Sequence, residues 1–352
     1  MEKVFSAKLM GGRISEVYFS SSRKSVDEKL SEFGSNSLFV FDENTKDLVS
    51  RCGRNTIVLP SGEEYKTLES ITKILDKALS LSLSRDSLFI AVGGGVICDM
   101  TAFAASIYMR GARTLLVPTT LLSQVDASVG GKSGVDYSGY KNLVGSFFPA
   151  EMIIIDSEML ISLPDDQFLS GMGEVVKHAF LSPDNRLFDF LRSNSDKIMQ
   201  RDADVLKEMV KLSLEVKKHY IELDPEEKRG IRSFLNLGHT FSHALETITD
   251  YQVSHGLGVA WGVKMALDAG VLTGITEKDY RDKTVELLSM FPFRLDYDFG
   301  DKLDDYLDAI GKDKKKKNGT VKFVLMEGQG RPVLSELDST SILKVVSQSF
   351  NL

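Results

Sequence analysis

The chain has 352 residues, more than one hydrophobic core usually organises, so we expect two domains. Hydrophobic residues make up 42% and charged residues 26%, which is typical of a globular protein. The net charge of −7 argues against nucleic acid as the main partner, because binding a phosphate backbone needs a basic surface. The sequence shows neither an apolar signal core at Met1–Phe5 nor a membrane-length apolar run, so we expect a cytoplasmic protein without a membrane partner.

Short apolar runs alternate with helical periodicity in the first half of the chain. Strands separated by helices are typical of a mostly parallel sheet covered on both faces. We predict strands at 38–41, 57–59, 88–92, 115–117 and 152–156, and helices at 67–82 and 96–109.

Helical periodicity dominates after about residue 160. We predict helices at 165–182, 184–199, 201–223, 234–249, 256–273 and 276–291, a short strand at 321–325 and a terminal helix at 339–349. The sequence therefore predicts an α/β domain over 1–160 and a helical domain over 161–352.

A glycine turn, Gly93-Gly94-Gly95, joins a predicted buried strand to a predicted helix. Glycines there would let the backbone approach a pyrophosphate, and the helix would present free N–H groups to it. The spacing is not G-x-G-x-x-G, so a purely structural turn remains an alternative. Asp42 ends another strand, where it could accept hydrogen bonds from a ribose or simply occupy a surface turn.

Three of the five histidines lie between residues 239 and 255. His239 and His243 are four residues apart and share a helix face, which is compatible with two ligands of one metal. His255 precedes another predicted helix. Glu174, in an apolar helix, could add a carboxylate ligand or could form an ordinary ion pair with Lys177.

Several basic residues accompany these motifs. In an acidic protein, converging cations indicate an anionic small molecule such as a phosphate or carboxylate. The dense run 312–317 is either a solvated turn or a loop that closes over such a substrate. The other cations are Arg110, Lys132, Lys141, Lys177, Lys217 and Arg232.

Taken together, the motifs resemble those of 3-dehydroquinate synthase, in the family's order and with near-family spacing from about residue 40 to residue 325. They are Gly93-Gly94-Gly95-Val96 with Asp99, the segment 117–126, Gly130-Gly131-Lys132, Lys141-Asn142, the segments 173–177 and 235–244, His255-Gly256 and Asp313-Lys314-Lys315.

The resemblance implies a Rossmann-like NAD domain followed by an all-α domain that binds metal and substrate. It implies conversion of 3-deoxy-D-arabino-heptulosonate 7-phosphate, a phosphorylated sugar acid, to 3-dehydroquinate and phosphate in the shikimate pathway. Tightly bound NAD, a divalent metal (zinc, alternatively cobalt) and a homodimer are implied as well. NAD is regenerated in each turnover, so the enzyme would be a lyase.

The resemblance also implies roles for individual residues. The metal falls on Glu174, His239 and His255, which moves His243 to the substrate side. NAD contacts fall on Asp42, Glu63, Lys66, Gly94, Gly95, Val96, Asp99, Thr119, Thr120, Lys132, Lys141, Ser162 and Leu163. Substrate contacts fall on Asp126, Lys132, Asn142, Lys177, Lys217, Arg232, Asn236, His243 and Lys314, with Arg110 contacting phosphate from a second subunit. The chain departs from the family pattern at Asp136, where Asn is common, and at Tyr140, where Gly is common.

Three other functions compete with this interpretation. A 2-epi-5-epi-valiolone synthase or a 2-deoxy-scyllo-inosose synthase would share the metal and NAD sites but act on substrates without a carboxylate. Arg232 and Asn236, beside the metal histidines in sequence, favour the carboxylate-bearing substrate. A metal-dependent polyol dehydrogenase would release NADH, and a metal-binding scaffold would have no turnover.

Overall fold

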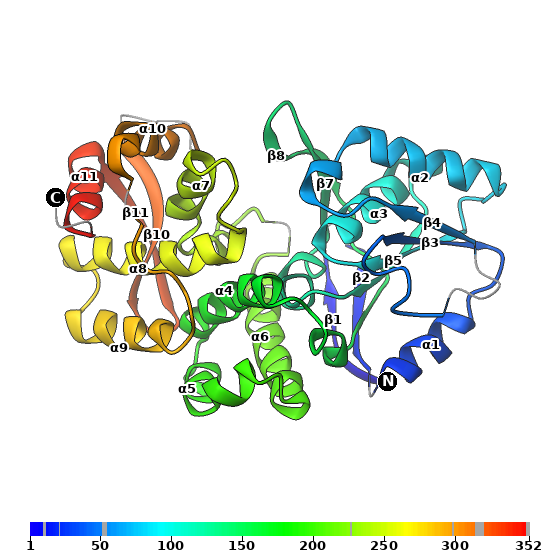
Figure 1. Ribbon diagram of the computed structural model, residues 1–352, viewed down its shortest axis with the longest axis horizontal. Coiled ribbons are helices and arrows are strands. Elements are labelled where there is room, and N and C mark those ends of the chain that lie inside the picture. Colours follow the sequence, from blue (N-terminus) through cyan, green and yellow to red (C-terminus); the bar gives the residue numbers. More distant parts are fainter. Residues whose placement is uncertain are drawn as a thin grey trace. The chain divides into compact units, whose positions relative to one another are not determined.

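The computed structural model describes residues 1–9, 12–20, 22–50, 55–225, 227–297, 299–313 and 320–349. The chain divides into two compact units, Met1–Pro164 and Asp165–Leu352 (Figure 1). Lys314 and most of the basic run lie outside the described residues. Among the helices described, none combines the length and the apolar character needed to cross a membrane.

A seven-stranded sheet forms the centre of the N-terminal unit, in the order β1-β2-β9-β6-β5-β3-β4. The six strands from β2 to β4 run parallel, and β1 pairs antiparallel with β2 at one edge. The strands are β1 (Glu2–Lys8), β2 (Ile14–Phe19), β3 (Ser37–Asp42), β4 (Thr56–Leu59), β5 (Leu88–Gly93), β6 (Arg113–Pro118) and β9 (Met152–Ile155).

Both faces of the central strands are apolar, which explains their continuous hydrophobic runs. Side chains alternate between the faces of a strand, and Phe39, Phe41, Ile90 and Val92 join one buried cluster with residues of α1 (Arg23–Ser31). The helix α3 (Gly95–Ile107) packs against β5 and β6 and also contacts α2 (Leu68–Ser80). The predicted α/β class is confirmed.

A separate hairpin of β7 (Lys132–Tyr137) and β8 (Tyr140–Phe147) belongs to the same unit. Its sequence gave no strand signal, because β8 is exposed over most of its length and lacks apolar alternation. β1, β2 and α1 were missed as well, since their apolar residues are interspersed with charged ones.

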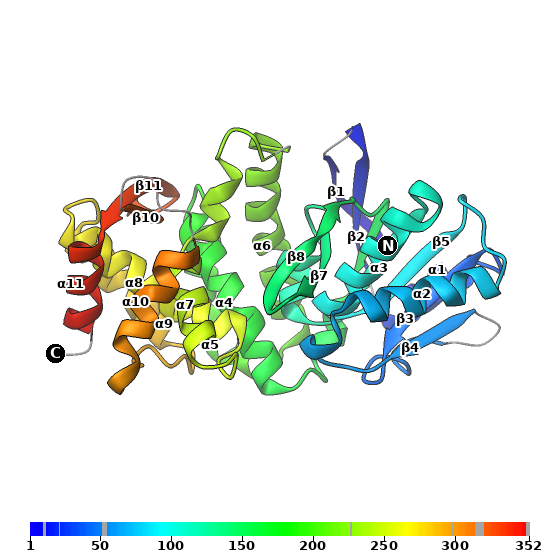
Figure 2. The ribbon, with the colours of Figure 1, turned by 90° about the horizontal axis from the view of Figure 1, so that it is seen from above.

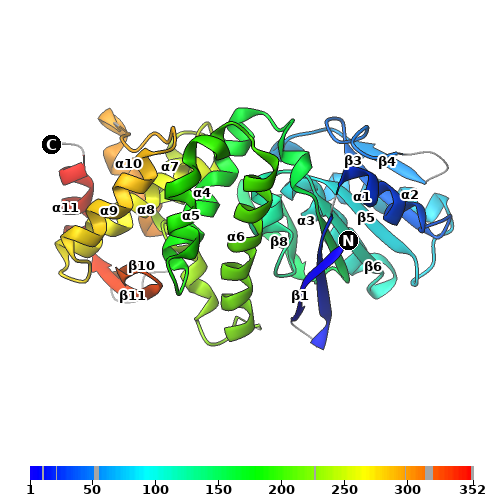
Figure 3. The same cartoon turned by 90° about the horizontal axis from the view of Figure 1, so that it is seen from below.

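The C-terminal unit is mainly helical, as predicted, but it also contains the hairpin of β10 (Thr320–Gly328) and β11 (Arg331–Asp338). The sequence indicated only part of β10, so "all-α" describes the unit incompletely. Figure 3 shows α4, α5 and α6 side by side. The helices are α4 (Asp165–Leu181), α5 (Arg186–Met199), α6 (Ala203–Leu223), α7 (His239–Ile248), α8 (His255–Leu272), α9 (Lys278–Ser289), α10 (Leu303–Asp313) and α11 (Ser339–Ser349).

One predicted helix was wrong in its extent. The periodicity at 234–249 indicated a continuous helix, but the chain forms a 3-10 turn, Arg232–Asn236, before α7 begins at His239. Gly238 separates the two pieces in a left-handed conformation with φ of 80°, a conformation that glycine adopts without steric cost.

Candidate metal and substrate site

Glycine contacts between helices place three potential metal ligands. Gly173 in α4 lies against the backbone of Gly256 in α8, so closely that a side chain on either glycine would overlap the other helix. Gly238, before α7, lies against Gly262 of α8 in the same way. Figure 2 shows these three helices; α8 contacts both α4 and α7, and these two contacts bring together the residues next to the glycines.

Those neighbouring residues are Glu174, His239 and His255. Nε2 of His239 lies 3.7 Å from Oε1 of Glu174, and Nε2 of His255 lies 3.5 Å from the same oxygen. One carboxylate oxygen and two imidazole nitrogens thus come within ligand distance of a common point. His243 is not in this group, although its ring lies 5.5 Å from that of His239; it forms a second set of potential ligand atoms with Glu246 and His255.

The Nδ1 atoms of both histidines face hydrogen-bond acceptors. Nδ1 of His239 lies 3.2 Å from the carbonyl oxygen of Leu237, and Nδ1 of His255 lies 2.9 Å from Oε1 of Glu246. An imidazole that donates from Nδ1 keeps a lone pair on Nε2, the atom that faces Glu174. Glu246, the partner in the second contact, is not among the residues predicted from the sequence.

The electrostatics of the cluster favour a cation. Glu174 is fully buried; burial alone would raise the pKa of its carboxyl, but Lys177, His239 and His255 hold it well below the ordinary value. Burial also opposes protonation of His255, yet Glu174 and Glu246 together raise its pKa to about 10. The two carboxylates therefore favour a positive charge at His255, either a proton or a metal ion that displaces it from Nε2.

The residues present fit a divalent metal. Neither oxygen of Glu174 meets hydrogen-bond geometry with any described residue, although the carboxylate pairs with Lys177. A buried carboxylate with two imidazoles is a donor set that zinc accepts, with a fourth position open to substrate. Lys177 is itself almost fully buried, which places a fixed positive charge beside this set.

Basic and amide side chains predicted to bind substrate lie on elements packed around α4. Lys217 is buried in α6, while Arg232 and Asn236 belong to the 3-10 turn that contacts both α4 and α6. Asp224, another residue missed from sequence, accepts hydrogen bonds from backbone N–H groups of Lys228, Arg229 and Arg232. It therefore fixes the loop that carries the buried Arg232.

The carboxyl ends of β3, β5 and β6 form a second candidate site in the N-terminal unit. Along the chain, β4 is added on one side of β3 and β5 on the other, so the strand order reverses between β3 and β5. Parallel sheets typically bind ligands at such a topological switch point. Asp42 ends β3, Gly94 and Gly95 begin α3 directly after β5, and Thr119 follows β6. The predicted cofactor residues of these three segments thus meet at one edge.

A buried lysine connects further predicted residues at this edge. Nζ of Lys66 lies 2.8 Å from Oδ2 of Asp99, 3.7 Å from Oε1 of Glu63 and 2.5 Å from Oδ1 of Asn142. Burial would lower the pKa of Lys66, but Asp99 and Glu63 raise it above the ordinary value. Asp136, where Asn is common in the family that the sequence resembles, belongs to the same group, since its Oδ1 accepts a hydrogen bond from the backbone N–H of Asn142 at 2.7 Å.

The remaining predicted residues occupy helix starts, turns and the hairpin. Val96 lies in the first turn of α3 and Thr120 follows Thr119, whereas Ser162 and Leu163 lie in the turn before α4. Asp126 lies in a π-helical turn, a geometry frequent at functional sites. Lys132 and Lys141 are exposed on the hairpin, and Arg110 has a left-handed φ of 65° after Met109 at 47°.

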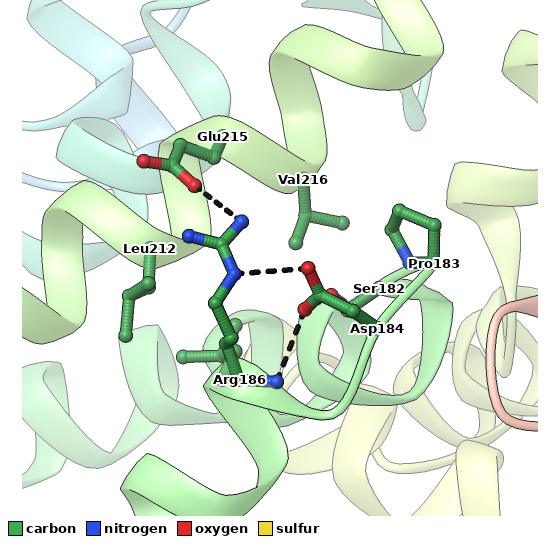
Figure 4. Close-up of a pocket in the computed structure, with 8 residues that line it drawn as sticks. Ser182, Pro183, Asp184, Arg186, Leu212, Glu215 and Val216 are labelled. Carbon is green, nitrogen blue, oxygen red and sulfur yellow. Dashed lines mark hydrogen bonds and ion pairs between the residues drawn. The ribbon is translucent and has the colours of Figure 1, made fainter.

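A small surface pocket in the C-terminal unit contains none of these residues. It lies between the start of α5 and the middle of α6, where Arg186 pairs with Asp184 and Glu215 at 2.9 and 2.8 Å (Figure 4). Because Arg186 already pairs with both carboxylates that line the pocket, nothing in it indicates a ligand.

Comparison with known proteins gives matches over both units. Residues 56–170 match the family profile "3-dehydroquinate synthase N-terminal", and residues 171–316 match "3-dehydroquinate synthase C-terminal". The 3-dehydroquinate synthase of Sulfurovum sp. is 41% identical, over 84% of this chain and 82% of that protein. The Francisella tularensis protein of that name is 40% identical, over 80% of this chain and 79% of its own length.

The match to a bifunctional 3-dehydroquinate synthase/phosphatase of Fusobacterium nucleatum, 40% identical over 83% of this chain, spans only 44% of that longer protein. Among solved structures, a 2-deoxy-scyllo-inosose synthase complexed with carbaglucose-6-phosphate, NAD+ and Co2+ has a TM-score of 0.85 at 23% identity, covering 98% of this chain and 99% of that one. A 2-epi-5-epi-valiolone synthase from Streptomyces hygroscopicus, with NAD+ and Zn2+ bound, has a TM-score of 0.83 at 22% identity, covering 95% of this chain and 96% of that one. These likenesses show the fold.

Proposed function

This chain belongs to the 3-dehydroquinate synthase family, and we propose that it converts 3-deoxy-D-arabino-heptulosonate 7-phosphate to 3-dehydroquinate and phosphate. The observation that carries the proposal is the roughly 40% identity to dehydroquinate synthases across both units. The convergence of Glu174, His239 and His255 supports it, because the reaction requires a metal site.

We assign a divalent metal, zinc or cobalt, to Glu174, His239 and His255. NAD is assigned to the switch point of the sheet, within a cofactor domain over 1–160, while the domain over 161–352 holds metal and substrate. When bound, the metal would polarise substrate hydroxyls and NAD would accept and return a hydride. The NAD contacts are Asp42, Glu63, Lys66, Gly94, Gly95, Val96, Asp99, Thr119, Thr120, Lys132, Lys141, Ser162 and Leu163.

The cationic side chains orient the anionic substrate. Arg232 carries a planar fork suited to a carboxylate, and its loop is fixed by Asp224. Lys177 contributes a charge whose position is set by its pair with Glu174. Holding a reactant in this way can lower a barrier by several kcal/mol, at the extreme about 7–11 kcal/mol. His243, next to His239 on α7, is suited to hold or transfer a proton on the substrate side.

The further substrate contacts and the assembly also remain proposals. Arg110 is assigned to phosphate across the interface of a homodimer, and the site of action is the cytoplasm. The contacts proposed in addition are Asp126, Lys132, Asn142, Lys217, Asn236 and Lys314.

The rival cyclases differ in the substrate rather than in the fold. The inosose and valiolone synthases share the architecture at 22–23% identity, well below the 40% of the dehydroquinate synthases. The discriminating experiment measures phosphate release by the purified protein from two substrates under the same conditions. They are the heptulosonate phosphate and sedoheptulose 7-phosphate, which lacks the carboxylate. We expect faster phosphate release from the heptulosonate phosphate; preference for sedoheptulose 7-phosphate would replace the proposal with a valiolone-type reaction.

A further inference from the structure

Glu246 stands out among the buried charged residues because it contacts His255 without belonging to the three predicted ligands. It lies on α7, seven residues after His239, which places both on the same face of that helix. Only 2% of the residue is exposed. A buried carboxylate is costly unless it is paired or hydrogen-bonded, so its contacts indicate what it does.

Two of those contacts converge on one oxygen. Oε1 of Glu246 lies 2.9 Å from Nδ1 of His255 and accepts a hydrogen bond from Oγ of Ser242 at 3.0 Å. Ser242 reaches this position because α8 approaches α7 at Gly258, where any larger residue would overlap the serine hydroxyl. The carboxylate is therefore held from its own helix and directed toward the first residue of α8.

The two imidazoles of the cluster therefore face hydrogen-bond acceptors of different charge. His239 faces the neutral carbonyl of Leu237, whereas His255 faces a full negative charge. A carboxylate behind an imidazole fixes which nitrogen carries the proton, orients the ring and makes the opposite nitrogen a stronger donor. Nε2 of His255 faces Glu174, so these effects act at the predicted metal position.

We propose that Glu246 is a positioning residue that orients His255 and strengthens its Nε2 as a metal ligand, with Ser242 holding the carboxylate in place. This inference rests on the metal site of the proposed function. It assigns to the chain a carboxylate–histidine–metal arrangement at one of the two histidines and a carbonyl–histidine–metal arrangement at the other.

The test measures metal affinity rather than turnover. The metal-free full-length protein is titrated with Zn2+ and Co2+ in competition with a chromophoric chelator, and the visible spectrum of the Co2+ form is recorded. Loss of an outer partner of this kind typically weakens metal binding by about 10–100-fold. Glu246→Gln keeps the shape of the side chain but removes its charge, and we expect it to weaken metal binding by about tenfold. We expect Glu246→Ala to weaken metal binding by about 100-fold and to alter the Co2+ spectrum.

The matched control removes a carboxylate on α8, the helix that begins with His255. Asp268 on α8 accepts from Lys264 at 2.8 Å and from Arg281 at 2.7 Å. Asp268→Asn should lower the unfolding midpoint in urea while leaving metal affinity within a factor of two. Unfolding of the metal-free Glu246→Gln protein shows whether this variant retains the fold.

The outcomes separate this inference from the proposed function. Wild-type affinity in both Glu246 variants would overturn the role of Glu246 and leave the metal site intact. An equal loss in Asp268→Asn would also overturn it, since the effect would then be one of general stability. If the wild type bound neither metal, the inference and the assigned metal site would fall together, and the substrate assay would still judge the reaction separately.

Discussion

At the scale of single residues, the roles of His239 and His255 depend on what their Nδ1 atoms contact. In His255 that atom faces Glu246, and in His239 it faces a backbone carbonyl, which leaves both Nε2 atoms directed at Glu174. In the fully buried His178, Nδ1 lies 2.7 Å from the hydroxyl of Ser213, a contact that sequence spacing could not reveal. Spacing alone would have paired His239 with His243; only the family resemblance predicted His255 in its place.

Replacement of individual histidines tests this assignment. His255→Ala should lose bound metal and nearly all activity, because one of three ligand atoms is removed. His243→Ala should keep the metal and lose activity, since its ring lies outside the group around Glu174. Metal content after gel filtration, measured by elemental analysis, distinguishes the two variants. Equal metal loss in both would show that the ligand set is wrong.

Asp224 gives a prediction about pH. Burial would raise the pKa of its carboxyl, but backbone N–H groups of Arg229, Arg232 and Lys228 hold it below the ordinary value. A carboxyl with a lowered pKa in the folded state stabilises the protein above its unfolded pKa, about 3.9, and this contribution disappears as the pH falls through the folded value. Asp224→Asn should therefore be less stable in urea at pH 6, with the difference from the wild type narrowing below about pH 4. A difference independent of pH would contradict the ionised state of Asp224.

At the scale of helices and strands, glycines in helix contacts decide where the candidate ligands lie. Gly173, Gly238 and Gly256 each adjoin one candidate ligand in sequence, and each allows a helix backbone to approach another closely. The sequence displayed these glycines as parts of motifs, but their packing role depends on which helices meet, which local periodicity does not specify. The same limit explains why the helix predicted at 234–249 was too long: its amphipathic pattern continues across Gly238, where the backbone turns.

Gly256→Ala tests the contact between α4 and α8. Alanine is the better helix former, so helix propensity alone would stabilise α8. The added methyl group would overlap the carbonyl of Ser170, and overpacking of this kind usually costs about 1–3 kcal/mol. We expect a lower unfolding midpoint and weaker metal binding. Gly34→Ala, where the methyl group meets no atom within 4 Å, serves as the control and should change neither.

Gly95→Ala tests the start of α3. Here a methyl group would lie 3.4 Å from Cβ of Ala127, a distance that the fold tolerates. In the proposed cofactor site it would obstruct a pyrophosphate at the helix N-terminus. Calorimetric titration should show at least tenfold weaker NAD binding with an unchanged unfolding midpoint. Unchanged NAD affinity would mean that the glycine turn is only structural.

At the scale of the whole chain, the class of each unit followed from the pattern of apolar residues. Continuous runs such as 88–92 indicated buried parallel strands, and long amphipathic periods indicated the helices after residue 160. The hairpins were harder to predict because exposed strands carry little hydrophobic pattern. Glu246 and Asp224 were missed because their contacts are hydrogen bonds formed across a turn or loop, four to nine residues along the chain, which apolar periodicity does not indicate.

The most direct measurement follows phosphate, 3-dehydroquinate and NADH absorbance together while the purified protein, supplied with NAD and zinc or cobalt, acts on the heptulosonate phosphate. A dehydroquinate synthase returns the hydride in every turnover, so phosphate and dehydroquinate should appear in equal amounts without net growth of the NADH band. Accumulation of one NADH for each substrate consumed would place the protein among the dehydrogenases instead. Absence of both products from folded, metal-loaded protein would contradict the proposed reaction.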